Sequence, residues 1–263
     1  MREKLSGPLK RLLAQAHRRS RVERRLVEDR GRSHTPCGPQ SSSRARFTDG
    51  VQPDQADLPA RLEVAQTLDG DGLYDAALSD AAFAGMQAPG LTIETCVLER
   101  VMLAGAQLRG AHLRDVEMRD CDLANADLRG LRARRVRIAG VRLTGALLSE
   151  ADLGDVDLVG CQADLTAFAG ARLDRTRIAS CDLRDSDWQS ARLSKVLFEG
   201  CNLSGADLSA AQFESVELRD CRLDGIRGAA DLRGISMSWD DVLASAGVFA
   251  TACGVRVVPP GVS

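Results

Sequence analysis

The sequence predicts an all-β coil of short parallel walls, four to a turn, closed at its carboxyl end by an α-helix. From Leu78 to Gly228 every fifth residue can be taken as a centre, and 27 of these 31 centres are Leu, Ile, Met, Phe or Trp. The residue two before each centre is small or apolar, and the residue between the two is mostly polar. No insertion breaks this register, so one architecture covers the whole stretch.

Each five-residue unit is interpreted as one extended wall followed by a corner. Apolar residues two positions apart lie on one face of an extended segment. A continuing strand would reverse that face after five residues, so the two remaining positions, rich in Gly, Asp and Ser, must turn the chain. Five cysteines at multiples of 20 residues (Cys121, Cys161, Cys181, Cys201 and Cys221) indicate four walls per turn. At about 4.8 Å per turn, the repeats predict nearly eight turns and a rod of about 37 Å.

The predicted core consists of the inward-facing residues of every wall. Aromatic residues make up only 3% of the chain, so Leu, Val, Ala and Cys must fill this core. We interpret the cysteines as packing residues, because none has a CxxC partner or a zinc-like cluster with histidine. The predicted core members are Leu123, Leu128, Leu143, Leu153, Leu183, Trp188, Leu203 and Leu208 at centres, with Cys161, Cys181, Cys201 and Cys221 two residues before centres.

Composition divides the chain into four parts. The first 50 residues hold 13 Lys and Arg against 5 Asp and Glu, so residues 1–46 form a basic tail. The favoured interpretation is a disordered or partly helical extension, although such a tail could contact nucleic acid or anionic lipid through phosphate charge. Residues 47–75 are an irregular entry, 76–230 the coil and 231–263 the cap. No secretory signal or long apolar run is present, so a cytoplasmic location is expected.

The coil needs closure, because its last turn would otherwise expose unpaired backbone groups. Ser238 and Asp241 have the spacing of a capping box, which predicts a helix over about 239–252. Its apolar side would consist of Val242, Leu243, Ala246 and Phe249. A homodimer through this segment and a monomer with a simple cap both remain open.

Several of the repeats resemble a known family. The runs at 126–130 (ADLRG), 201–205 (CNLSG) and 206–210 (ADLSA) resemble the A(D/N)LXX motif of pentapeptide-repeat proteins, and the resemblance covers about 155 of the 263 residues. It implies a right-handed quadrilateral β-helix. It also implies one specific activity, since some family members resemble duplex DNA in shape and negative charge and bind type II topoisomerases in its place.

Charge bears on that activity. The four walls carry net charges of minus 2, minus 1, plus 2 and minus 3, so none is a strong acidic stripe. One wall is rich in arginine and would repel a surface that binds DNA. The leading hypothesis is therefore a non-enzymatic scaffold that presents charged, rigid walls to an unknown protein partner. A DNA-mimicking inhibitor or protector of DNA gyrase is the alternative.

A glycan-active β-helix enzyme is a remote alternative. It would use paired carboxylates, for which two clusters are candidates: Asp152, Asp155 and Asp157, and Asp182, Asp185 and Asp187. Both clusters fall on regular repeat positions, and neither has a histidine partner or a long cleft-forming loop. The sequence therefore predicts no catalytic residue, no metal and no cofactor.

Overall fold

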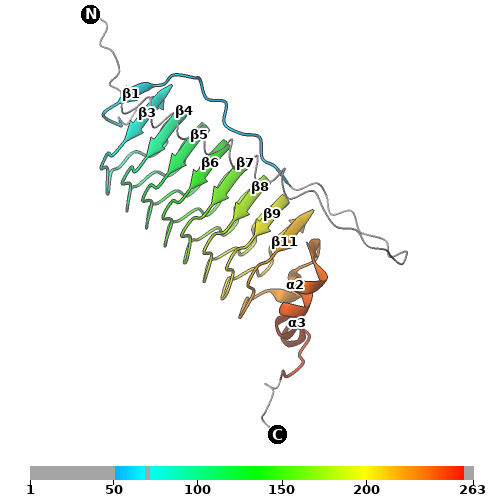
Figure 1. The fold of residues 1–263 in the computed structure, drawn as a ribbon. Helices are drawn as coiled ribbons and strands as arrows, with labels where there is room; N and C mark the ends of the chain where they lie inside the picture. Colours follow the sequence, from blue (N-terminus) through cyan, green and yellow to red (C-terminus); the bar gives the residue numbers. More distant parts are fainter. Residues whose placement is uncertain (1–50, 69–71, 258–263) are drawn as a thin grey trace, which may run out of the picture. The chain divides into compact units, whose positions relative to one another are not determined.

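The computed structural model of the protein describes residues 51–68 and 72–257. The basic tail predicted over 1–46 lies outside the described residues, so its contacts with nucleic acid or lipid stay predictions. The described chain forms one 12-stranded parallel sheet wound into a coil, with short helices at its carboxyl end (Figure 1). No helix in the described ranges has the length and apolar character needed to cross a membrane.

Strands recur once per turn of the coil. They are β1 (Glu63–Ala65), β2 (Leu73–Tyr74), β3 (Ala76–Ser79), β4 (Thr92–Glu99), β5 (His112–Arg119), β6 (Arg132–Ala139), β7 (Asp152–Val159), β8 (Arg172–Ala179), β9 (Arg192–Glu199), β10 (Gln212–Glu214), β11 (Val216–Arg219) and β12 (Ile235–Met237). Each strand from β4 to β9 covers two walls and pairs in parallel with the strand 20 residues later, as Leu113 does with Ala133. The other two walls pair through single bridges, such as Met102 with Asp122 and Gln107 with Asp127. The predicted four walls per turn are confirmed.

Corners hold residues in the left-handed region of backbone space. Many corners use glycine, but one column of corners does not: φ is 53° at Asp115, 53° at Arg135, 56° at Asp155, 47° at Arg175 and 53° at Lys195. Left-handed backbone is costly for residues with a Cβ. The paired strands of neighbouring turns hold these five residues there, so the corner carries charged side chains in place of glycine.

The centres stack in files inside the coil. All the predicted core leucines are buried, as are Cys161, Cys181 and Cys201. Trp188 is fully buried, with its ring stacked on Phe168 at a centroid distance of 4.1 Å and edge-on to Phe198 at 5.7 Å. The prediction that Cys221 belongs to the buried core is wrong, since this residue is only half-buried. It lies in the last turn, where no complete further turn covers it.

The carboxyl end differs from the single helix predicted over 239–252. The structure has a short 3-10 helix η2 (Ala229–Asp231) and two α-helices, α2 (Trp239–Ala244) and α3 (Ala246–Ala252). Ser238 caps α2 as predicted, since its hydroxyl accepts a hydrogen bond from the Asp241 amide at 3.1 Å. The chain bends at the buried Ser245, whose φ and ψ of −97° and 7° leave the helical region, and the bend places α3 against η2.

This bend changes which side chains cover the coil. Val242 and Phe249 are half-buried, as expected of a cap. Leu243 and Ala246 are exposed, so they do not cover the coil, and a dimer contact through them stays a prediction. A continuous helix would have aligned the four residues, whereas the bend at Ser245 turns the second pair relative to the first.

Candidate interaction surface

An extended segment, residues 51–58, lies along one edge of the coil; we call it the strap. Figure 1 shows it in blue, running past the ends of several successive strands towards β1. Val51, Pro53, Ala56 and Leu58 are half-buried, whereas the Asp54 and Asp57 residues are exposed. The strap therefore buries its small apolar residues and turns its acidic residues outward.

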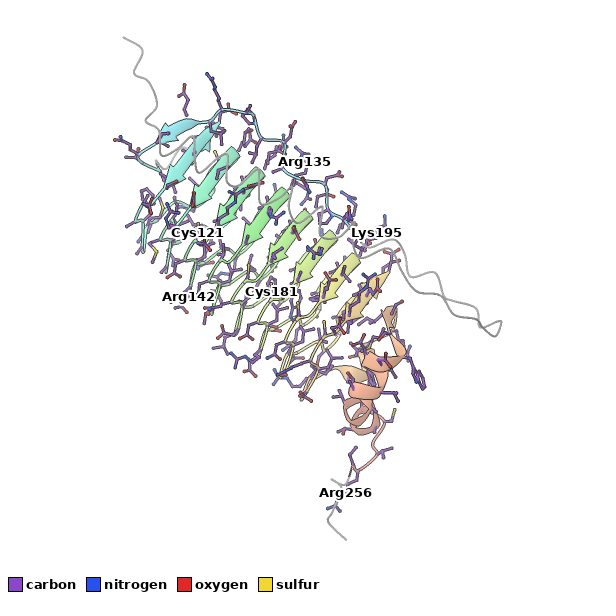
Figure 2. All side chains as sticks on the ribbon, in the orientation of Figure 1. Cys121, Arg135, Arg142, Cys181, Lys195 and Arg256 are labelled. Atoms are coloured by element: carbon purple, nitrogen blue, oxygen red, sulfur yellow. The ribbon has the colours of Figure 1, made fainter. Side chains whose placement is uncertain are left out.

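The strap lies on the column of charged corners, which we call the charged corner: Asp115, Arg135, Asp155, Arg175 and Lys195. The backbone N–H of Asp57 donates to Oδ1 of Asp115 at 2.9 Å. The backbone N–H of Asp54 donates to Oδ1 of Asp155 at 3.4 Å. Figure 2 labels Arg135 and Lys195 on this edge.

Arginines pair with both aspartates of the charged corner. Arg135 donates to Asp115 through Nε at 2.7 Å and Nη2 at 2.5 Å. Arg175 donates to Asp155 through Nε at 2.7 Å and Nη2 at 2.6 Å. Such two-pronged pairs fix both side chains in a single geometry. Lys195, at the next position, forms no ion pair with any residue that the structure describes.

These contacts set the ionisation of the two aspartates. The hydrogen bonds from Arg135 hold the pKa of Asp115 below its usual value against the opposing effect of burial, and the Asp57 amide adds to this. Arg175 and the Asp54 amide lower the pKa of Asp155 in the same way. Both carboxylates stay charged at neutral pH and can accept the strap's N–H groups.

Acid should release the strap. Because the native pKa values of Asp115 and Asp155 lie below those of the unfolded chain, their contribution to stability is present above about pH 4 and is lost as the pH falls through the native values. We expect amide exchange at Asp54 and Asp57, corrected for intrinsic rates, to lose protection below about pH 4 while the core strands stay protected. Protection unchanged down to the pH of global unfolding would contradict this expectation.

A cavity of about 510 Å³ lies between the strap and the neighbouring wall. Its floor carries both positive and negative side chains: Arg177 pairs with Asp157 at 3.3 Å and with Glu199 at 2.8 Å. Arg219 reaches the floor as well and pairs with Glu217 at 2.6 Å. Because its charges neutralise one another, the floor favours neither a cation nor an anion.

The carboxylates considered for glycan chemistry are mostly tied to arginines. Asp152 pairs with Arg134 at 2.7 Å, and Asp182 pairs with Arg184 at 2.6 Å. The arginine beside Asp182 lowers the pKa of that carboxyl, as Arg175 does for Asp155. A general acid in glycoside hydrolysis needs a raised pKa. The geometry therefore gives no support to the glycan-active alternative.

Arginines also neutralise carboxylates on another wall. Asp127 is contacted by Arg109 at 2.5 Å and by Arg129 at 2.7 Å. Asp207 is contacted by Arg227 at 3.1 Å. A surface that imitates DNA needs a row of uncompensated negative charges. Both aspartates lie in the same column of bridges, so these pairs reduce the acidic character of one wall.

The cysteines form part of the backbone hydrogen-bonding scheme. The thiols of Cys161, Cys181 and Cys201 each donate to the carbonyl oxygen of the residue 23 positions earlier, at 3.5, 3.7 and 3.3 Å. Thr166 fills the same slot, and its hydroxyl donates to the Leu143 carbonyl at 2.9 Å. A small side chain with a donor therefore suits this position, which explains why Cys and Thr recur there.

Thiol reactivity should follow this burial. Burial raises the pKa of the Cys96 and Cys121 thiols, and both side chains are enclosed. Cys253 is exposed. We expect iodoacetamide at pH 8 to label Cys253 within minutes and to label the buried thiols only in denaturing urea, because thiolate and access are both needed. Peptide mass mapping measures this, and rapid native labelling of Cys121 would contradict it.

Two family models match the coil. The model described as "Pentapeptide repeat region" matches residues 132–208, and the model described as "Pentapeptide repeats (8 copies)" matches 94–130, 102–138 and 191–227. Together the matches run without a gap from residue 94 to residue 227, about half of the chain. The chain belongs to the pentapeptide-repeat family. Membership agrees with the fold and assigns no partner.

Several solved pentapeptide-repeat proteins are similar to this chain. One from the thylakoid lumen of Arabidopsis thaliana is 28% identical, with a TM-score of 0.35, over 39% of this chain and 68% of that one. QnrB1, a plasmid-mediated fluoroquinolone resistance protein, is 20% identical, with a TM-score of 0.31, over 72% and 99%. HetL, involved in heterocyst differentiation regulation in Nostoc sp. strain PCC 7120, is 20% identical, with a TM-score of 0.28, over 60% and 85%. No curated protein matches the chain.

The strap was not predicted from the sequence. The alternation of negative and positive charge along the charged corner is visible in the sequence, since Asp115, Arg135, Asp155 and Arg175 follow one another at intervals of 20 residues. Lining up the repeats by turn would have revealed these ion pairs. The strap's own contacts with the corner come from backbone N–H groups, and the pattern of side chains in a sequence does not predict such contacts.

Proposed function

We propose that this pentapeptide-repeat protein is a non-enzymatic scaffold whose rigid charged walls bind a protein partner in the cytoplasm. The observation that carries the proposal is the ordered, paired charge of the charged corner, with the strap seated on it. A surface of fixed ion pairs that already holds one polypeptide segment has the chemistry for binding another.

The neutralised carboxylates also support a binding role over catalysis. Asp155 and Asp182 have lowered pKa values and arginine partners, which suits structural ion pairs rather than proton transfer. Pairs of this kind discriminate among partners by geometry and sign of charge. The proposal therefore assigns the walls to recognition.

The test is capture of partners from the host with matched charge variants. Full-length protein is compared with Arg192→Gln, on the wall of the charged corner, and with Arg142→Gln, on another wall. We expect at least one host protein to be retained by the wild-type chain, to bind it after purification with a Kd below tens of micromolar, and to be weakened by one variant only. If no purified host protein binds in this range, the proposal is overturned.

Inhibition or protection of DNA gyrase is the competing function that the family suggests. A supercoiling assay with purified gyrase separates the two functions. The scaffold proposal predicts no effect up to tens of micromolar, the range of a weak specific contact. Dose-dependent inhibition, or protection against a fluoroquinolone, would replace the general scaffold with a DNA-mimicking protein.

A further inference from the structure

The strap and the charged corner have matching spacings. Three residues of extended chain span about 10 Å, and two turns of the coil span about 9.6 Å. Asp57 and Asp54 are three residues apart, and the carboxylates that accept their N–H groups, those of Asp115 and Asp155, are two turns apart. An extended chain along this edge can therefore stay in register with alternate turns.

Each strap aspartate meets one complete ion pair of the corner. Asp57 donates its N–H to Asp115, and its negative charge also acts on Arg135, the partner of Asp115. Asp54 makes the same two interactions with Asp155 and Arg175. The repeated element is thus an aspartate that gives its amide to the carboxylate of an ion pair and adds its own negative charge on the same edge.

The register continues one step beyond the strap's acidic residues. The residue three before Asp54 is Val51, which lines the same cavity as Leu197, a residue of the turn that contains Lys195. Within the described residues Lys195 has no ion-pair partner, and valine cannot supply one. The corner offers three basic positions, and the strap's aspartates act electrostatically on two of them, Arg135 and Arg175.

We propose that the charged corner is a binding site for an extended acidic segment of the partner, with carboxylates at every third residue, and that the strap is its intramolecular occupant. This inference rests on the proposed scaffold function and names the site and the chemistry of its ligand. The strap's exposed aspartates and few hydrogen bonds make it displaceable. A partner segment with a third carboxylate gains an ion pair with Lys195 that the strap lacks.

Tethering strengthens the strap's hold. A segment joined to its own site by a short linker acts at an effective concentration in the millimolar range. A free peptide of the same sequence competes poorly with the intact protein for that reason. A peptide with the third carboxylate should compete better, and both peptides should bind more tightly once the strap is released.

The experiment uses the full chain and three fluorescent decapeptides. The first has the sequence of residues 50–59, the second is the same peptide with Val51→Asp, and the third has the composition of the second with carboxylates at every second residue. The proteins are wild type, Lys195→Gln and two proline variants. Asp54→Pro/Asp57→Pro lacks both donating N–H groups and both carboxylates, whereas Gln52→Pro/Gln55→Pro adds two prolines to the strap and keeps them. Circular dichroism checks the fold of each.

We expect the second peptide to bind Asp54→Pro/Asp57→Pro at least 10-fold more tightly than wild type, and Gln52→Pro/Gln55→Pro to behave as wild type. The second peptide should bind about 5-fold more tightly than the first, and Lys195→Gln should abolish that difference. In the wild-type chain, excess second peptide should speed amide exchange at Asp54 and Asp57. The third peptide should bind at least 10-fold more weakly than the second.

Three results would overturn the inference: equal binding of the second and third peptides, binding to wild type without faster exchange in the strap, or no binding to any variant. The last of these leaves the scaffold function standing if a purified host protein still binds and is weakened by a variant on another wall. Failure of both experiments would remove the scaffold function as well.

Discussion

Replacing Trp188 with Ala is expected to lower the free energy of unfolding by about 3–5 kcal/mol. The side chain is 0% exposed and stacks on Phe168, and it meets the edge of Phe198. Its Nε1–H donates to Oγ of Ser186 at 2.8 Å, and that hydroxyl donates to the Leu183 carbonyl at 2.6 Å. The substitution removes these contacts and leaves a cavity that the rigid turns on either side cannot close.

Urea unfolding followed by far-UV circular dichroism measures this loss. The matched control is Trp239→Ala, because Trp239 is 73% exposed at the start of α2, and it should change the free energy by less than about 0.5 kcal/mol. Trp188→Leu should fall between the two, since leucine is the common centre residue elsewhere in the coil. Equal losses for Trp188→Ala and Trp239→Ala would mean that the stacked, buried centre residues do not determine the stability of the coil.

The contrast between Trp188 and the strap explains how much could be predicted. The burial of Trp188, Leu123 and Leu183 follows from a five-residue period with no insertion, because each repeat constrains its neighbours one turn away. The interruption at Ser245 was missed because apolar residues at helical spacing fit one long helix or two short ones equally well. The strap was missed because its contacts are made by backbone amides with residues far away in sequence.

The charged corner lies between these cases. The sequence predicts one arginine-rich wall at this position, but net charge per wall hides the alternation of Asp115, Arg135, Asp155 and Arg175. Opposite charges in neighbouring turns attract, whereas a simple sum treats them as cancelling. The position of each charge along the coil is therefore more informative for binding than the total on a wall.

The carboxyl end gives the other large expected effect, through Gly234. This residue precedes β12 and has a φ of 91°, and a Cβ built on it would overlap the carbonyl oxygen of Phe213. Gly234→Ala combines the cost of left-handed backbone, about 1–2 kcal/mol, with overpacking of about 1–3 kcal/mol. We expect a loss of about 3 kcal/mol in the local stability of the last turn and its cap.

Gly130→Ala is the matched control for backbone strain alone. Gly130 has a φ of 67°, and a Cβ there would meet no atom within 4 Å. It should cost about 1 kcal/mol. Because the turns of a solenoid interact only with their neighbours, Gly234→Ala should open the end of the coil before its middle.

Hydrogen exchange separates the two effects. In Gly234→Ala, amides of β12, α2 and α3 should exchange at least 10-fold faster while those of β6 and β7 keep their wild-type rates. In Gly130→Ala, the smaller change should centre on the turns around residue 130. If both variants shifted all amides equally, the coil would unfold as one cooperative unit, and the cap at its carboxyl end would not be a separate element of its stability.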